Sequence, residues 1–284
     1  MKIALGTVQM GMDYGQAKFQ SKTPKDVCSQ ILELAKVSGI ALLDTAIRYG
    51  ESEKTLGDIG IRQWRVVTKL PAVPSGAEIL PWMRNEIRGS LDRLNINKLY
   101  GILLHRPDQL NTSKGNSILH SLLAMKEEGL CENIGISIYD PAELDPMPLD
   151  SLDIVQAPVN LLDRRIITSG WLKKLKRAGI EIHARSVFLQ GLLLLDDAER
   201  PSKFDKWSTT WSIYRDWLAK TGLTRLQACM SFVNSIDEID QLIVGVNSEQ
   251  QLREIIEAND TCTKSFPERL SINDSMLLNP SNWR

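Results

Sequence analysis

The chain contains few cysteines, and they do not form a pattern typical of metal binding or of a disulfide framework. The four cysteines are far apart in the sequence, at Cys28, Cys131, Cys229 and Cys262. They include no CxxC pair, and no histidine stands beside them at metal-ligand spacing. We therefore expect isolated reduced thiols and no metal site.

The sequence also lacks long apolar runs and an excess of charge of either sign. Its longest aliphatic run, residues 192–195, is too short to span a bilayer, and residues 1–6 do not resemble a signal peptide. Lys and Arg total 34 against 35 for Asp and Glu, which leaves no field that would attract nucleic acid or an anionic membrane. A cytoplasmic protein without nucleic-acid or membrane partners is expected.

Short β-branched runs alternate with longer amphipathic stretches along all 284 residues. The short runs predict eight strands, at 3–5, 40–43, 66–69, 99–105, 133–137, 154–157, 180–185 and 242–245. The amphipathic stretches predict helices at 25–38, 52–59, 79–94, 118–128, 142–145, 169–178, 207–220 with 223–232, and 249–258. Gly39, Gly129 and Gly179 each separate a helix from the next strand, where a helix end favours a left-handed residue.

This alternation predicts an α/β fold, a single-domain (β/α)₈ TIM barrel over residues 1–284 with its active site at the C-terminal ends of the strands. The alternative is an open doubly wound sheet, but residues 6–11 do not form its GxGxxG phosphate loop. Residues 259–284 fall outside the repeat. Because this segment contains Met276, Leu277, Leu278 and Trp283, we expect a C-terminal tail that docks on the barrel.

Four residues with chemically useful side chains follow three successive predicted strands: Asp44, Tyr49, Lys69 and His105. At the C-terminal ends of parallel strands they would meet on one rim of the barrel. A neighbouring ammonium favours a phenolate, so we expect Lys69 to lower the pKa of Tyr49, and Asp44 to pair with Lys69. Each residue alone has a structural interpretation. These are, in order, Asp44 as a helix or loop cap, Tyr49 as packing at the rim, Lys69 as a solvated strand end and His105 as a buried core histidine. The presence of all four together favours proton transfer to a carbonyl, with His105 hydrogen-bonded to the reacting oxygen.

With these residues in place, the chain resembles the aldo-keto reductases, which are NAD(P)-dependent (β/α)₈ barrels. The resemblance covers nearly the whole chain and rests on motifs in family order: Gly6-Thr7, the Asp44–Gly57 block, Thr68-Lys69, Leu104-His105-Arg106-Pro107, Ile134-Gly135-Ile136-Ser137, Gln156, Gln190-Gly191-Leu192-Leu193 and Gly245-Val246-Asn247-Ser248.

The resemblance implies hydride transfer between a nicotinamide and the carbonyl carbon of an aldehyde or ketone, or the reverse. Tyr49 would be the general acid or base, with Lys69 and Asp44 tuning it and His105 orienting the substrate. No metal is implied. The positions implied to bind the cofactor are Gly6, Thr7, Ser137, Gln156, Arg185, Ser186, Gly191, Gly245, Asn247, Ser248 and Gln251.

Three positions depart from the family pattern. Ile138 replaces the usual Asn after Ser137, and Arg185 replaces an aromatic residue that commonly stacks on the nicotinamide. A guanidinium there would stack instead, or would pair with an acidic substrate. The resemblance implies NADP(H), but Asn247 replaces the basic residue for the 2′-phosphate. NAD(H) is therefore the alternative. Arg253 could donate hydrogen bonds to the 2′-phosphate in place of residue 247, but its simpler interpretation is a solvated helix residue.

The implied partner is a small-molecule carbonyl or alcohol. Residues 8–10, Val-Gln-Met, replace a tryptophan that lines the pocket in many relatives, so we expect a wider and more polar site. Residues 185–193 resemble a bacterial branch linked to sugar and polysaccharide metabolism, which suggests a sugar-like substrate. The alternatives are a cofactor-binding regulatory or interaction protein on the same scaffold, and a different barrel enzyme using His105 with a carboxylate.

Overall fold

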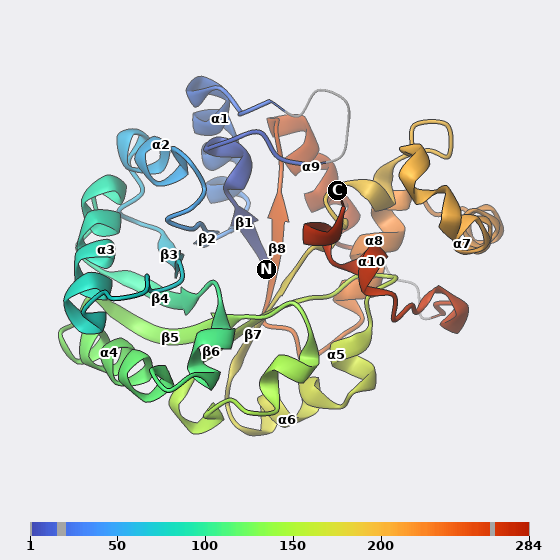
Figure 1. Ribbon diagram of the computed structural model, residues 1–284. Helices are drawn as coiled ribbons and strands as arrows, with labels where there is room; N and C mark the ends of the chain where they lie inside the picture. The colour runs from blue at the N-terminus through green and yellow to red at the C-terminus, as the bar shows by residue number, and fades with distance from the viewer. Residues whose placement is uncertain (1, 16–20, 262–264, 284) are drawn as a thin grey trace.

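The computed structural model describes residues 2–15, 21–261 and 265–283. Eight parallel strands close into a barrel in chain order, with β8 paired to β1 and the helices around the outside (Figure 1). The strands are β1 (Ile3–Gly6), β2 (Leu42–Asp44), β3 (Arg65–Leu70), β4 (Leu99–Leu104), β5 (Cys131–Ser137), β6 (Ile154–Pro158), β7 (Glu181–Arg185) and β8 (Gln241–Gly245). The predicted fold class is confirmed.

The helices follow the predicted alternation with a few differences. They are α1 (Lys25–Val37), α2 (Ser52–Ile59), α3 (Ile79–Leu94), α4 (Gly115–Glu127), α5 (Arg165–Thr168), α6 (Trp171–Arg177), α7 (Ser208–Thr221), α8 (Arg225–Asn234), α9 (Glu249–Ala258) and α10 (Ser275–Leu278). Short 3₁₀ helices are η1 (Val8–Met10), η2 (Pro107–Asn111), η3 (Pro141–Leu144), η4 (Leu149–Ser151), η5 (Leu192–Leu194), η6 (Ser202–Trp207), η7 (Glu268–Leu270) and η8 (Pro280–Asn282).

Two helix predictions need correction. The stretch 142–145 is the 3₁₀ helix η3, because an Asp140 cap and Pro141 begin a single turn that ends at once. The stretch 169–178 begins later, as α6 at Trp171, because Gly170 has a φ of 78° and separates α6 from the short helix α5, which was not predicted. The glycine punctuation is confirmed: Gly39, Gly129 and Gly179 have φ values of 78°, 77° and 75°.

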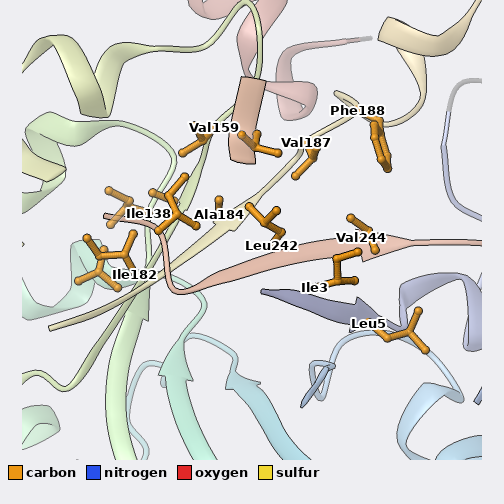
Figure 2. Packing of buried hydrophobic residues seen from close by; sticks show 14 of the residues in the cluster. Ile3, Leu5, Ile138, Val159, Ile182, Ala184, Val187, Phe188, Leu242 and Val244 are labelled. Carbon is orange, nitrogen blue, oxygen red and sulfur yellow. The ribbon is translucent and has the colours of Figure 1, made fainter. Parts of the chain in front are cut away.

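Alternate strand residues point to opposite sides of the barrel wall. One small cluster takes one residue from each of six strands, and such residues can meet only across the barrel interior: Ala4, Leu42, Val67, Leu103, Ile154 and Ile243. Their sequence neighbours pack in the larger cluster between strands and helices. Figure 2 shows part of it, with side chains from β1, β7 and β8 gathered together: Ile3, Leu5, Ile182, Ala184, Leu242 and Val244.

Polar side chains fill the barrel at the N-terminal ends of the strands. His183 is fully buried, and its Nε2 lies 3.0 Å from Glu181 Oε1. The Tyr100 hydroxyl donates to the other Glu181 oxygen at 2.6 Å. Because side chains occupy this end of the interior, the opposite end is left for a ligand.

Residues 265–283 lie against the barrel. Leu270, Leu277 and Leu278 are buried, and the amide of Ile272 donates to the carbonyl of Leu162 at 2.9 Å. The ring of Trp283 meets Phe204 edge to face at 4.9 Å between centroids. This segment therefore contributes to the packed structure near the mouth of the barrel.

Candidate active site

A buried ion pair joins the C-terminal ends of β2 and β3. Asp44 is the last residue of β2, and its Oδ1 accepts a hydrogen bond from Lys69 Nζ at 2.6 Å. The ammonium also donates to the carbonyl of Thr45 at 2.9 Å. Lys69 is 1% exposed and Asp44 4% exposed, so the pair is shielded from solvent. Burial lowers the pKa of Lys69, and the charge of Asp44 opposes that shift.

The pair continues into a row of hydrogen bonds across the barrel mouth. Gln156 Nε2 donates to Asp44 Oδ2 at 2.7 Å, and Ser137 Oγ donates to Gln156 Oε1 at 3.2 Å. Lys69, Asp44, Gln156 and Ser137 come from β3, β2, β6 and β5. The row therefore fixes the orientation of the Gln156 amide. The family resemblance implies that this amide contacts the cofactor.

Tyr49 lies on the loop after β2, above the ion pair. Lys69 Nζ is 5.1 Å from the centroid of the Tyr49 ring. The His105 ring, directly after β4, meets the Tyr49 ring edge to face at 6.0 Å between centroids. The four side chains predicted to share one rim, Asp44, Tyr49, Lys69 and His105, are thus brought together.

The Tyr49 loop packs against a glycine of the segment after β1. The amide of Glu51 donates to the carbonyl of Gly11 at 3.2 Å. A Cβ on Gly11 would lie 1.8 Å from the Tyr49 carbonyl oxygen, far inside contact distance. Only a glycine permits this approach, so Gly11 helps to set the position of the phenol.

The Ser-Glu pair that follows the tyrosine has a structural role. Ser52 Oγ donates to the carbonyl of Thr7 at 2.9 Å, which ties the start of α2 to β1. Glu53 is 2% exposed and accepts hydrogen bonds from Thr68 and Ser90, at 2.7 and 2.6 Å. Because Thr68 adjoins Lys69, this contact also supports the strand that carries the ammonium.

The electrostatics of Tyr49 differ from the prediction. Burial raises the pKa of Tyr49 above its usual range, and the charge of Asp44 raises it further. The net shift is upward, so the expected lowering of the Tyr49 pKa was wrong in direction: burial outweighs the nearby positive charges. Burial and the Lys69 charge lower the pKa of His105 to about 4. At neutral pH the site therefore holds a protonated phenol and a neutral imidazole.

A cavity of about 610 Å³ surrounds these groups and extends to the space between β8 and α9. All of the predicted site residues line it except Ser248: Gly6, Thr7, Asp44, Tyr49, Lys69, His105, Ser137, Gln156, Arg185, Ser186, Gly191, Gly245, Asn247 and Gln251. Ser248 instead caps α9, since its Oγ accepts the amide hydrogen of Gln251 at 3.2 Å.

Two of the positions that depart from the family pattern, Ile138 and Arg185, are in contact with each other. Arg185 Nη2 donates to the carbonyl of Ile138 at 2.8 Å, and its guanidinium carbon lies 4.4 Å from the centre of the Tyr139 ring. Ile138 is fully buried and belongs to the hydrophobic cluster in Figure 2. The side chain of Ile138 therefore packs in the core, while its backbone positions Arg185.

The loop after β7 forms one wall of the cavity and contains unusual backbone. Ser186, Leu189 and Gln190 have φ values of 59°, 47° and 53°, although none is glycine. A non-glycine residue in this left-handed conformation costs on the order of 1–3 kcal/mol, which contacts with the surrounding structure must offset. Leu189 is fully buried, and Val187 and Phe188 pack beside β8 (Figure 2). Core packing therefore holds the loop in this shape.

A second cavity of about 620 Å³ adjoins the first beside His105. Arg48, His105, Tyr139 and Ser281 line both cavities, and Ser281 belongs to η8 in the C-terminal tail. This space begins beside His105, and among the described residues that line it none comes from β8 or α9.

Sequence reasoning missed several residues of the cavity wall. Tyr14 lies in a segment without periodic pattern, and burial raises its pKa to about 12. Tyr139 follows Ser137 by two residues, and its place at a strand end was the available signal. Glu254 was missed because it lies on an exposed helix face, and Pro280 because it belongs to the tail.

Other predicted features have the following outcomes. Cys28, Cys131 and Cys229 are buried free thiols, whereas Cys262 lies outside the described residues. Among residues 2–15, 21–261 and 265–283, no group of three or more His, Cys, Asp or Glu side chains is arranged to hold a metal. Within these ranges, no helix has the length and apolar character needed to cross a membrane.

Comparisons with known proteins identify the family of this chain. A chloroplastic pyridoxal reductase of Arabidopsis thaliana is 34% identical over 139 residues, which cover 42% of this chain and only 37% of that protein. The structure is similar to that of the aldo-keto reductase AKR11C1 from Bacillus halodurans in its holo form, with a TM-score of 0.75 at 18% identity, over 99% of this chain and 95% of the other. The model of the aldo/keto reductase family matches residues 2–268. The chain therefore belongs to the aldo/keto reductase family of oxidoreductases.

Proposed function

We propose that this protein transfers hydride between NAD(P)(H) and the carbonyl carbon of an aldehyde or ketone, with Tyr49 as the proton donor. The observation that carries the proposal is the position of Tyr49, with its ring 5.1 Å from Lys69 Nζ and 6.0 Å from the His105 ring. A phenol held beside an imidazole at the mouth of a barrel suits protonation of a carbonyl oxygen.

The residues of the cavity fit a nicotinamide dinucleotide. Gln9 lines the cavity, and its Oε1 is buried without a hydrogen-bond partner in the described part of the chain. Such an acceptor suits a ribose hydroxyl. Ser137 and Gln156 present polar atoms that are already oriented by Asp44, as a carboxamide would require. The bound cofactor would supply the hydride.

The remaining steps belong to the side chains. Tyr49 is protonated at neutral pH and delivers its proton to the carbonyl oxygen as negative charge develops there. Neutral His105 hydrogen-bonds the same oxygen and orients the substrate. Lys69 offsets part of the cost of the developing phenolate, because its ammonium lies under the ring, and Asp44 holds that ammonium in place.

We propose a sugar-like carbonyl compound as the substrate class. Polar side chains, among them Gln9, Arg48 and Gln190, line the cavity, and the second cavity adds room beyond His105. Pyridoxal is the substrate in the name of the Arabidopsis relative, so an aromatic aldehyde belongs in the same test panel. The intact set of four residues favours an enzyme over a regulatory protein that binds the cofactor without turnover.

The test measures oxidation of NADH and NADPH with aldoses, simple aldehydes and pyridoxal. We expect turnover by the wild type and a loss of at least about 100-fold in kcat for Tyr49→Phe, with cofactor affinity unchanged. Tyr100→Phe is the matched control, because it removes a phenol hydroxyl from the other end of the barrel. Wild-type rates in Tyr49→Phe would refute the role of Tyr49.

A further inference from the structure

Arg48 stands where the two cavities meet. It directly precedes Tyr49, and its exposed side chain lines both the cavity around the four candidate site residues and the adjoining second cavity. The backbone on either side of it is held in place. The Ile47 amide donates to the carbonyl of Lys69 at 3.3 Å. The Tyr49 amide donates to the carbonyl of Ala46 at 3.0 Å. The guanidinium is therefore attached at a fixed place beside the phenol.

The side chain of Arg48 has no partner within residues 2–15, 21–261 and 265–283, since it makes neither an ion pair nor a hydrogen bond there. The other arginines of the two cavities are engaged. Arg106 Nε lies 3.3 Å from Asp108 Oδ1. Arg185 donates to the carbonyl of Ile138 at 2.8 Å. Arg48 therefore keeps its donors for a ligand.

The carboxylates around the second cavity do not cancel the charge of Arg48. Glu143 Oε1 accepts the amide hydrogens of Tyr139 and Asp140, at 2.9 and 2.8 Å, and Asp108 is paired with an arginine. Outside α9, the described walls of the two cavities contain four cations and three carboxylates: Arg48, Lys69, Arg106 and Arg185 against Asp44, Asp108 and Glu143. One positive charge is left in excess.

The same excess of positive charge acts on His105. Its pKa is lowered by burial and then by the charges of Lys69, Arg185 and Arg106, while the charge of Asp44 opposes them. His105 lines both cavities. A negatively charged group is therefore attracted to the place where the two cavities join.

The kind of anion follows from the number of free cations. A guanidinium is planar and donates two parallel hydrogen bonds to a carboxylate. A phosphate monoester carries about −1.5 to −2 charges at neutral pH, which one excess positive charge does not balance. A carboxylate is therefore the better match for Arg48.

We propose that Arg48 determines the substrate specificity by binding a carboxylate of the substrate, so that the enzyme acts on carbonyl compounds that are also acids. The carboxylate lies beside the second cavity, and the carbonyl carbon lies at Tyr49 and His105. Sugar acids are the members of the sugar-like class that meet this requirement. This role of Arg48 rests on the proposed function, because it takes the reacting carbonyl to lie at Tyr49.

The experiment compares substrates that differ in a single group. D-Glucose, D-glucuronate and D-glucose 6-phosphate share one aldose and differ at C6, and the corresponding galactose series is measured beside them. Butanal and succinic semialdehyde form a smaller pair without hydroxyl groups. Steady-state rates with saturating NADH or NADPH give kcat and KM. We expect kcat/KM to be at least about 10-fold higher for each carboxylate than for its neutral partner, and lower for the phosphate than for the carboxylate.

Arg48→Gln should reduce this ratio of acid to neutral substrate at least about 10-fold, through a higher KM for the acid with little change in its kcat. Arg48→Lys, which keeps the charge without the planar fork, should recover part of the ratio. Arg106→Gln should reduce the ratio less, because Arg106 is paired with Asp108. Arg62→Gln is the matched control, since Arg62 is exposed and lines neither cavity.

Equal kcat/KM values for acids and neutral carbonyls in the wild type would overturn the role of Arg48 and leave the reductase proposal standing. An equal loss on both kinds of substrate in Arg48→Gln, or a larger fall of the ratio in Arg106→Gln, would have the same meaning. A preference for the 6-phosphate over the carboxylate would overturn the choice of a carboxylate. Absence of turnover with every carbonyl compound would overturn the proposed function as well.

Discussion

Lys69 Nζ lies 2.6 Å from Asp44 Oδ1, and neither side chain has more than 5% of its surface exposed. The two charges come from adjacent strands, so barrel closure removes both from water together. A buried pair of this kind contributes little net stability while intact, but its loss on one side leaves a charge without compensation.

We predict that Lys69→Met lowers the free energy of unfolding by about 3–5 kcal/mol, because it leaves the Asp44 carboxylate buried and unpaired. The double variant Asp44→Asn/Lys69→Met should recover at least about half of this loss. Urea unfolding monitored by circular dichroism measures the three free energies. If the double variant is less stable than Lys69→Met by the full cost of Asp44→Asn alone, the pair is not coupled.

The raised pKa of Tyr49 predicts different pH profiles for the two directions of the reaction. Under the proposed role of Tyr49, carbonyl reduction uses the protonated phenol, so its kcat should stay level from about pH 6 to pH 9. Under the same role, alcohol oxidation uses the phenolate, so its rate should rise about 10-fold per pH unit below the pKa of Tyr49. Steady-state rates in both directions test this. A plateau in the oxidation rate below pH 8 would contradict the raised pKa.

His105 should make the protein less stable in mild acid. Its pKa is lowered from 6.5 to about 4 in the folded protein, so between these values the unfolded chain binds more protons. The contribution of neutral His105 is complete above pH 6.5 and is lost as pH falls toward 4, by at most about 3 kcal/mol. Urea unfolding at pH 7 and pH 4.5 should show a smaller difference in His105→Gln. The same substitution at exposed His120 should leave the difference unchanged.

Gly11→Ala should impair the enzyme through the Tyr49 loop. The added Cβ would lie 1.8 Å from the Tyr49 carbonyl oxygen, so the loop must move. Since misplacement of a reacting group by about 1 Å can cost about 100-fold, we expect kcat to fall by roughly that factor. Gly39→Ala is the control: no heavy atom lies within 4 Å of its added Cβ, and only its φ of 78° is strained. That variant should lose about 1 kcal/mol of stability and retain full activity.

The sequence predicts this fold well because each local rule points to the same architecture. The β-branched runs mark all eight strands, and the glycines at 39, 129 and 179 mark helix ends. The four candidate site residues could be found in the sequence for the same reason. Asp44, Lys69 and His105 stand at or near strand ends, and the ends of parallel strands converge wherever a barrel closes.

Features that depend on tertiary placement could not be predicted from the sequence in this way. The raised pKa of Tyr49 follows from burial and from the charge of Asp44, and residue spacing does not reveal how deeply a side chain is buried. Tyr14 and Pro280 reach the cavity through irregular segments that lack periodicity. The cap at Ser248 did have a signal, since a serine followed three residues later by glutamine is typical of a helix start.

The hydrogen-bonded row through Lys69, Asp44, Gln156 and Ser137 affects when enzymatic activity appears during folding. Its members belong to four strands, β3, β2, β6 and β5, that are separated by up to 112 residues in the sequence. Neither half of the barrel, β1–β4 or β5–β8, contains all four strands. Turnover should therefore appear only after the two halves have folded together, which would make enzymatic activity a sensitive reporter of their association.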